Sequence, residues 1–289
     1  MSGQVVVGVD GSPSSLDAVQ TAAGEARLRG RGLRVVYAFL WPAMHPPSGP
    51  SPLGPVGGEL RAGVERVMAE AVQRARTAAP GVATANAVIA GEPRAVLESQ
   101  SRTAELIVVG NRGLGGFAGL LLGSTAVHLA AHGHCPVMVV RGRKDATGDI
   151  LLGADGSRAG RPAVDFAFAE ASLRGTPLIA FHAWNPRTER ALSGPADPRA
   201  LVCAEERLRD EATRQLAEAL SGKQEQYPDV PVHRRLVKAG PRPALIEASG
   251  SAQLLVVGAR GRGGFPGMLL GSVSQALRRH AQWPVTVVR

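Results

Sequence analysis

Two glycine-rich segments of similar sequence carry the residues best suited to chemistry in this chain. They read VVGNRGLGGFAGLLLGS (residues 108–124) and VVGARGRGGFPGMLLGS (residues 256–272), and each begins with a β-branched run. Both have the spacing Gly-x-x-Gly, nine residues, Gly-Ser, formed by Gly110, Gly113, Gly123 and Ser124 and then by Gly258, Gly261, Gly271 and Ser272. Glycines after a strand permit positive φ and let backbone N–H groups approach a ligand without a Cβ in the way.

The two Gly-Ser pairs stand directly before TAVHLAAH and VSQALRRH, which have a helical pattern. Ser124 and Ser272 are therefore expected near helix N-termini, where free amides and the helix dipole favour phosphate. A lone Gly-x-x-Gly would indicate a plain turn. Two copies of the complete spacing, each in a strand–loop–helix context, indicate two phosphate-binding loops.

An aspartate ends the first predicted strand of each half, in the matched segments VVVGVDGS and ILLGADGS. In a doubly wound sheet, ligands bind at the carboxyl ends of the strands where the winding reverses. Asp10 and Asp155 are thus expected to face the glycine loops. Because a carboxylate repels phosphate, each would contact a ribose hydroxyl or a metal ion that bridges the phosphates. The alternative is a turn or capping aspartate.

Three further blocks match between the halves, in the same order as the glycine-rich and Asp-Gly-Ser segments, which indicates a duplication. We expect one domain at residues 1–143 and a second at 148–289, with the polar linker GRKDATGD between them. The strands predicted in the first half are Val5–Asp10, Leu33–Phe39, Val82–Ala90, Glu105–Gly110 and Pro136–Arg141. Since helical spacing fills the gaps, the pattern predicts an α/β fold with two tandem doubly wound parallel sheets.

The segment Trp41–Glu59 is too rich in Pro and Gly for a regular element and is expected to be a long mobile loop, with disorder as the alternative. HGHC (residues 132–135) invites a metal site, but the second half keeps only one of its possible ligands, so a polar helix end is the better interpretation. Arg112 and Arg260 lie inside the glycine loops and would either neutralise phosphate or stay solvated.

The composition argues against a nucleic-acid-binding, disulfide-rich or membrane protein. The net charge of +9 comes from basic residues scattered singly among acids, and six Phe, three Trp and two Tyr leave few stacking platforms, so nucleic acid is not an expected partner. Two cysteines suit a reducing compartment. The first residues lack a secretory pattern and no apolar run could span a bilayer, so a cytoplasmic location away from membranes is expected.

These glycine loops and the Asp-Gly-Ser segments resemble the ATP-binding branch of the universal stress protein family, over essentially the whole chain. The resemblance implies two five-stranded parallel sheets in the order 3-2-1-4-5, with ATP as the cofactor and Mg²⁺ accompanying it near Asp10 and Asp155. It implies ribose and adenine-side contacts at these two aspartates and adenine contacts at the backbone of Ala38 and Ala183. The eight loop residues, together with Thr125 and Val273 after the Gly-Ser pairs, would form the phosphate sites.

The copies differ after the Gly-Ser pair, where the second half has Val273-Ser274 and the first has Thr125-Ala126. The family commonly has Val and a hydroxyl residue there, so tight triphosphate binding is less expected in the first half.

The chain lacks the motifs of P-loop NTPases, of kinases and of serine hydrolases. We therefore expect a non-catalytic, nucleotide-dependent stress or regulatory protein. A slow ATPase or nucleotidyl-transfer enzyme and an association protein with vestigial pockets remain the alternatives. The final strands of both halves would be apolar sheet edges, so pairing of the two domains through them, and a homodimer, are also expected.

Overall fold

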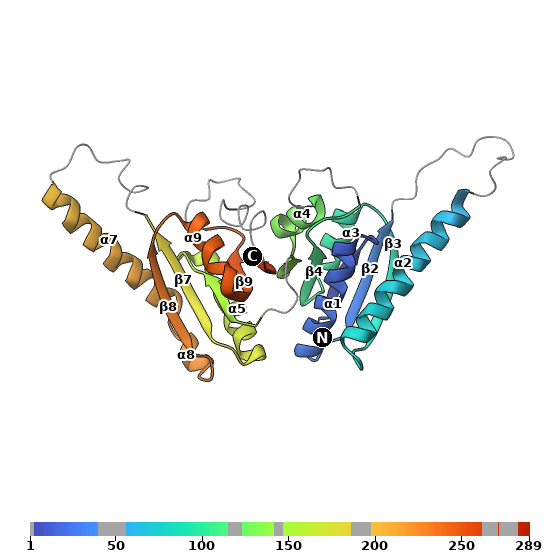
Figure 1. Ribbon diagram of the computed structural model, residues 1–289, viewed down its shortest axis with the longest axis horizontal. Coiled ribbons are helices and arrows are strands. Elements are labelled where there is room, and N and C mark those ends of the chain that lie inside the picture. The colour runs from blue at the N-terminus through green and yellow to red at the C-terminus, as the bar shows by residue number, and fades with distance from the viewer. Residues whose placement is uncertain are drawn as a thin grey trace. The chain divides into compact units, whose positions relative to one another are not determined.

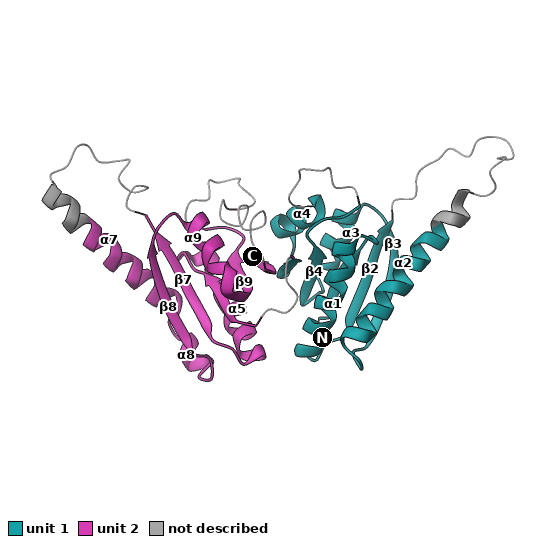
Figure 2. Cartoon of the chain, viewed as in Figure 1, with its two compact units in different colours: residues 1–140 teal, residues 141–289 magenta. Residues whose placement is uncertain are grey.

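The computed structural model describes residues 3–39, 56–114, 123–141, 147–185, 198–261, 271 and 283–289, with the backbone alone at 56–60 and 198–204. The chain divides into two compact units, residues 1–140 and 141–289 (Figure 2). Each unit is described by itself below.

The first unit is a five-stranded parallel sheet with two layers of helices (Figure 1). Its elements are β1 (Val5–Val9), α1 (Pro13–Leu28), β2 (Leu33–Phe39), α2 (Val56–Ala78), β3 (Thr84–Ala90), α3 (Pro93–Gln100), β4 (Leu106–Gly110), α4 (Ser124–His132) and β5 (Val137–Val140). The strand order is β3-β2-β1-β4-β5, which confirms the predicted fold class and order. The winding reverses between β1 and β4.

The second unit repeats this topology with the order β10-β9-β6-β7-β8. Its elements are β6 (Asp149–Gly153), α5 (Arg161–Arg174), β7 (Leu178–Trp184), α7 (Pro198–Ala219), α8 (Lys223–Gln226), β8 (Val232–Lys238), α9 (Pro241–Ala248), β9 (Ala252–Gly258) and β10 (Val285–Val288), with 3-10 turns at Arg158–Gly160 and Ser249–Ser251. Here β6 and β9 are the neighbours at the reversal.

The Asp-Gly-Ser segments turn each chain half from its first strand toward the first helix. Gly11 and Gly156 have φ of 87° and 71°, a left-handed conformation that glycine adopts at low cost. In α1, the Ser12 hydroxyl then accepts the Ser15 N–H at 3.2 Å, and Pro13 occupies the first helical turn, where a missing N–H costs nothing. In the second unit, Ser157 accepts the Gly160 N–H at 3.1 Å.

The sheet of the first unit is apolar on both faces, as parallel strands between helix layers must be. One face packs against α1, which buries Ala18, Val19, Ala22 and Ala23 completely. The other packs against α3 and α4 in one continuous cluster made of Val6, Val36, Val96, Leu97, Ile107, Val109, Ala126, Leu129, Val137 and Val139. These two helices therefore cover the face on which a site at the strand ends would open.

The prediction that Trp41–Glu59 contains no regular structure is wrong for its last residues. α2 begins at Val56 and includes Gly57, Gly58 and Glu59. Once a helix is nucleated, adding a residue costs little, so a long helix that packs against α1 extends through two glycines. Residues 40–55 lie outside the described part of the chain. None of the helices in the described ranges is long and apolar enough to cross a membrane.

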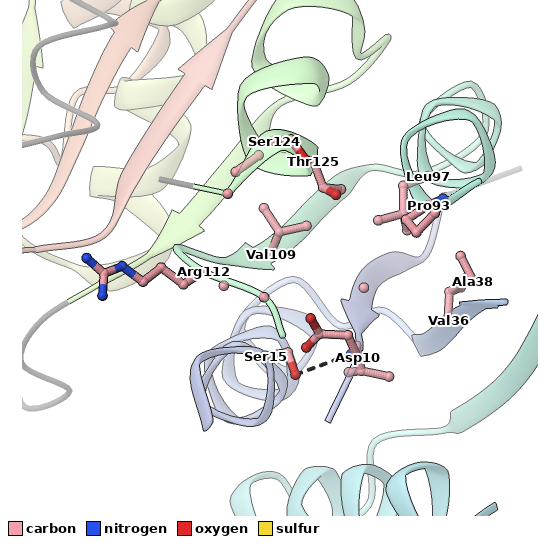
Figure 3. A pocket seen from close by; sticks show the side chains of 16 residues that line it. Asp10, Ser15, Val36, Ala38, Pro93, Leu97, Val109, Arg112, Ser124 and Thr125 are labelled. Carbon is pink, nitrogen blue, oxygen red and sulfur yellow. Dashed lines mark hydrogen bonds between the residues drawn. The ribbon is translucent and has the colours of Figure 1, made fainter. Parts of the chain in front are cut away.

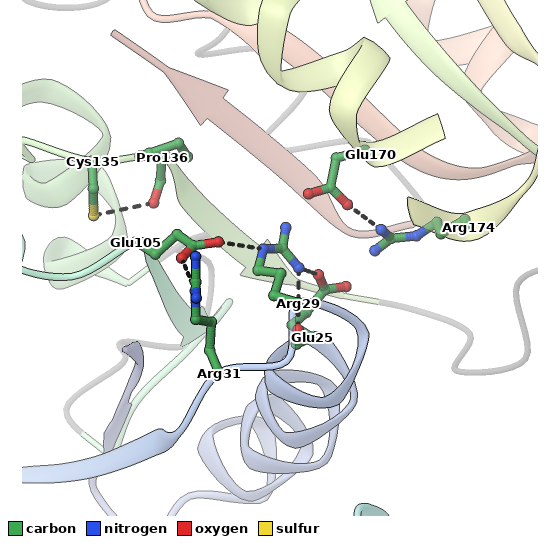
Figure 4. A network of polar contacts seen from close by, with 8 residues as sticks. All are labelled: Glu25, Arg29, Arg31, Glu105, Cys135, Pro136, Glu170 and Arg174. Carbon is green, nitrogen blue, oxygen red and sulfur yellow. Dashed lines mark hydrogen bonds and ion pairs between the residues drawn. The ribbon is translucent and has the colours of Figure 1, made fainter. Parts of the chain in front are cut away.

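An ion pair recurs at the same position of the repeat. Glu25 pairs with Arg29 at the end of α1, and Glu170 pairs with Arg174 at the end of α5 (Figure 4). In the first unit, Arg31 Nε also lies 2.6 Å from Glu105 Oε2, just before β4. The Arg31–Glu105 contact joins the segments that precede β2 and β4, at the sheet edge opposite to the one that carries Asp10.

Replacing Phe168 by Ala should strongly destabilise the second unit. The Phe168 ring is completely buried on α5 and lies 5.7 Å, centroid to centroid, from the ring of Tyr227. Loss of such a side chain costs about 3–5 kcal/mol. Urea unfolding followed by circular dichroism measures it. The control is Leu173→Ala on the same helix, where a side chain 42% exposed should cost under about 0.5 kcal/mol. Equal effects of the two variants would contradict this packing.

Candidate functional site

A cavity of about 470 Å³ opens at the carboxyl ends of β1, β2 and β4 in the first unit (Figure 3). Small-molecule sites in proteins commonly measure about 300–1,000 Å³. Its lining consists of Gly8, Val9, Asp10, Ser15, Val36, Ala38, Pro93, Leu97, Val109, Gly110, Arg112, Gly113, Gly123, Ser124, Thr125 and Ala126. The cavity is large enough for a nucleotide-sized ligand.

Every residue that the sequence nominated in the first half lines this cavity. They are Asp10, Ala38, Gly110, Gly113, Gly123, Ser124 and Thr125. The parallel pairing of β1 with β2 and β4 explains this, since Val7 lies opposite both Val35 and Val108. Chain segments that leave these strands at the same end must therefore meet.

The Asp10 carboxylate connects the two loops that meet there. Its Oδ1 accepts the Ser12 N–H at 3.0 Å, and its Oδ2 accepts the Leu114 N–H at 2.8 Å. The Asp10 N–H donates to Ser15 Oγ at 3.3 Å, the dashed line of Figure 3. Asp10 is thus a turn aspartate and a cavity residue at once. Each carboxylate oxygen has a second lone pair available for a ligand hydroxyl.

Close approach, and not backbone conformation, requires glycine at the second loop position. A Cβ on Gly113 would collide with Asp10 Oδ2, and one on Gly261 would collide with Asp155 Oδ2. None of the six loop glycines has positive φ, so the backbone freedom that glycine permits is not used at Gly110, Gly113, Gly123, Gly258, Gly261 or Gly271. The loop has to pass against a carboxylate, which leaves no room for a side chain.

The N-terminus of α4 forms the polar end of the cavity. Gly123 is the N-cap, and no side chain caps this helix. The Gly123 N–H donates to the Asn111 carbonyl at 2.7 Å, which fixes the helix start against the glycine loop. Ser124, Thr125 and Ala126 of the first turn line the cavity. Uncapped first-turn amides and the positive end of the helix dipole suit an anion.

The opposite end of the cavity is apolar. Val36 and Ala38 lie two residues apart on β2 and hence on one face, and α3 adds Pro93 and Leu97. Our sequence reasoning did not single out Val36, Pro93, Leu97 or Val109. A signal for all four was present, since each of them belongs to a segment that matches between the two halves.

A side-chain hydrogen bond joins the two helices that cover the cavity. His128 Nε2 of α4 lies 2.6 Å from Glu98 Oε2 of α3. The hydrogen bond from His128 lowers the pKa of Glu98 below its ordinary value. Counted from the Gly-Ser pairs, Ala276 stands where the first half has His128, so the second half lacks this imidazole.

The second unit brings together the corresponding predicted residues that the structure describes. Asp155 Oδ1 accepts the Ser157 N–H at 2.9 Å, and Gly261 packs against Asp155 Oδ2. The Gly271 N–H donates to the Ala259 carbonyl at 2.8 Å, as Gly123 does to Asn111. Gly258 ends β9, and Ala183 lies on β7. Ser272 and Val273 lie outside the described residues.

HGHC does not gather metal ligands. α4 ends at His132, and the His134 N–H donates to Ser101 Oγ at 2.9 Å. Burial raises the pKa of Cys135 to about 12, which keeps its thiol protonated. Within the described ranges, no group of three or more His, Cys, Asp or Glu residues could hold a metal ion.

The Arg112 side chain extends away from the other side chains that line the cavity (Figure 3). Of the two interpretations given above for this arginine, this orientation favours a solvated guanidinium.

Comparison with known proteins gives one consistent result. Residues 1–141 and 147–289 each match the model of the Universal stress protein family. The chain is 39% identical over 310 residues to Universal stress protein Rv1996 of Mycobacterium tuberculosis, an alignment that covers 99% of this chain and 94% of that protein. A universal stress protein of Mycolicibacterium smegmatis is 38% identical over 301 residues, with 99% and 96% covered.

A solved structure shares the fold. The crystal structure of a universal stress protein from Archaeoglobus fulgidus superposes with a TM-score of 0.69 at 21% identity and covers 100% of this chain and 99% of that one.

Gly113→Ala should displace the glycine loop. Its new Cβ would collide with Asp10 Oδ2, so the hydrogen bond from Leu114 should break, at a cost of about 1–3 kcal/mol. Amide hydrogen exchange at Leu114 should accelerate. Gly123→Ala is the matched control, because its Cβ would lie 3.6 Å from the nearest atom and only N-cap preference is lost, under about 1 kcal/mol. Unchanged exchange at Leu114 in Gly113→Ala would refute the close-contact account.

Tyr37 should ionise above the ordinary range. Burial, and then the negative charge of Asp10, raises the pKa of Tyr37. The chain has two tyrosines, so a Tyr227→Phe background isolates the Tyr37 phenolate in an ultraviolet pH titration. Asp10→Asn in that background should lower the pKa, because the neutral amide no longer disfavours the phenolate. Asp17→Asn should leave it unchanged. If the pKa of Tyr37 were the same with and without Asp10→Asn, the Asp10 carboxylate would lie too far from the phenol to raise its pKa.

Proposed function

Since the chain belongs to the universal stress protein family, with one family domain in each half, we propose that it is an ATP-binding regulatory protein with little or no catalysis. One observation carries the proposal. In the first unit, the aspartate after β1, the glycine loop after β4 and the start of α4 all line a single nucleotide-sized cavity.

The polarity of the cavity sets the orientation of the ligand. The adenine packs against the apolar wall of Val36, Ala38 and Leu97, and Asp10 accepts a hydrogen bond from a ribose hydroxyl. The phosphates then lie at Gly113, Gly123 and the first turn of α4, where amides and the helix dipole stabilise negative charge. The Gly-Ser pair and the residue after it, Thr125 or Val273, complete each phosphate site.

Mg²⁺ would enter with the nucleotide. Both Asp10 oxygens already accept backbone N–H groups, so the phosphates and water would supply most of the ligands of the ion. Mg²⁺ is usually bound in this way, through substrate phosphates and few protein groups.

The composition of the cavity supports binding without turnover. Among the described residues that line it, Asp10 is the only carboxylate, and none is a histidine. Hydrolysis requires a group that orients or deprotonates water. Since Asp10 is held by two amides, we infer that ATP is retained and acts by favouring one of two conformations or partners.

The oligomeric state of the protein and its location in the cell are also proposals. Pairing of the two domains through β5 and β10, and a homodimer, stay predictions from the apolar character of these short edge strands. A cytoplasmic location stays a prediction from the low cysteine content.

Calorimetry and mass spectrometry test the proposal. The wild-type chain should bind two equivalents of ATP, and gently purified, acid-denatured protein should release it. Gly113→Val and Gly261→Val should each lose one equivalent and the double variant both, because each new side chain collides with Asp10 or Asp155. ATP should bind more tightly than AMP or cyclic AMP, which place fewer charges at the helix N-terminus.

Three outcomes would count against this function. Turnover at about 1 s⁻¹ or faster would indicate an enzyme instead. Failure of a wild-type protein with native circular dichroism to bind any of these nucleotides would favour vestigial pockets. Ala38→Phe serves as a second blocking variant, since it fills the apolar end and leaves the glycine loop intact. Unchanged ATP stoichiometry in this variant would place the ligand elsewhere.

A further inference from the structure

The glycine loop of the first unit is attached to the start of α1 by side chains as well as by Asp10. The Ser14 hydroxyl donates to Asn111 Oδ1 at 2.6 Å, and Ser14 Oγ accepts the Arg112 N–H at 3.3 Å. Ser14 thus holds two consecutive loop residues. The contact is close because Gly110, beside it, has no side chain: a Cβ there would lie 2.5 Å from Ser14 Oγ.

Asn111 also connects α1 to the other side of the cavity. Its side chain accepts from Ser14, and its backbone carbonyl accepts the N–H of Gly123, the N-cap of α4, at 2.7 Å. Ser14, Asn111 and Gly123 therefore form a short chain of contacts from one helix N-terminus to the other. This chain sets the distance between the loop and the first turn of α4, which together line the polar end of the cavity.

The second unit keeps the backbone part of this arrangement and lacks the side chains. Ala159 stands at the position of Ser14, and Ala259 stands at that of Asn111. The Gly271 N–H still donates to the Ala259 carbonyl, at 2.8 Å. A methyl group neither donates nor accepts, so the second loop cannot have this link. Both partners differ together, as expected for residues that act as a pair.

We propose that Ser14 and Asn111 are a positioning pair that preorganises the first pocket and makes the two pockets inequivalent, with tighter binding and slower release of ATP at the first. This order is the reverse of the one expected above from Thr125-Ala126 and Val273-Ser274. This inference rests on the proposed function. Holding a loop in its binding geometry before the ligand arrives removes an ordering cost that the second pocket must bear on binding. One such hydrogen bond corresponds to about three- to tenfold in affinity.

Ligand-free protein gives the first test, which does not depend on ATP. Ser14→Ala should accelerate amide exchange at Arg112 and Gly123 and leave Gly271 of the second unit unchanged. Asn111→Ala should have the same effect at Gly123. Thr21→Ala, which removes another hydroxyl from α1, is the matched control. Unchanged exchange at Arg112 and Gly123 in both variants would overturn the proposed positioning.

ATP binding gives the second test, in a Gly261→Val background that leaves the first pocket alone. Ser14→Ala and Asn111→Ala should each raise the Kd by about three- to tenfold, mainly through faster release. The double variant should weaken binding no further than either single change, because the two residues act through one contact. Ser14→Thr keeps the hydroxyl and should restore the parent affinity, which a general loss of helix stability would not predict.

The outcomes separate the inference from the proposed function. If the Gly261→Val parent binds ATP while the Ser14 and Asn111 variants bind it equally well, or with independent additive losses, the positioning pair is refuted and ATP binding stands. If the parent binds no ATP although its fold is native, ATP binding at the first pocket and the inequivalence fail together. If it binds ATP more weakly than Gly113→Val does, the predicted order of the pockets is reversed and the inference is overturned.

Discussion

The pairing of β1 with β4 is the constraint on which the site depends. These strands lie far apart in the sequence, and their parallel register brings Asp10 and the glycine loop to one edge of the sheet. The hydrogen bond from the Leu114 N–H to Asp10 Oδ2 then closes the junction across 104 residues. The cavity exists because the winding reverses here and the helices that follow the two strands cover opposite faces.

This junction changes the physical meaning of the glycine pattern. Of the two properties that glycine offers a loop, free backbone angles and the absence of a Cβ, Gly113 and Gly261 use the second, because they make room for a carboxylate. Positive φ occurs in the Asp-Gly-Ser turns, at Gly11 and Gly156. The aspartate and the glycine therefore form one structural unit, and a change in either should disturb both the loop and the pocket. The same unit occurs in both halves.

Around this shared unit, the two halves differ in residues that touch the junction. Ser14 and Asn111 are replaced by Ala159 and Ala259, and Ala276 stands where His128 contacts Glu98 in the first half. The first of these differences removes a side-chain contact from the second loop, while the backbone hydrogen bond from Gly271 to Ala259 remains. The two halves thus share one architecture and differ in the side-chain contacts that hold the glycine loop in place.

The sequence by itself determined the duplicated α/β topology, the strand that each motif follows, and the aspartate, loop glycines and Gly-Ser pair that line the first cavity. β-branched runs, the Asp-Gly-Ser turn and the helix start at Gly-Ser are local signals that act over a few residues. Tertiary structure decided the rest. The collision that requires Gly113, the Ser14–Asn111 contact and the apolar wall at Val36 and Val109 join residues from different strands and helices. Their distances follow from packing between these elements, which no spacing along the chain encodes.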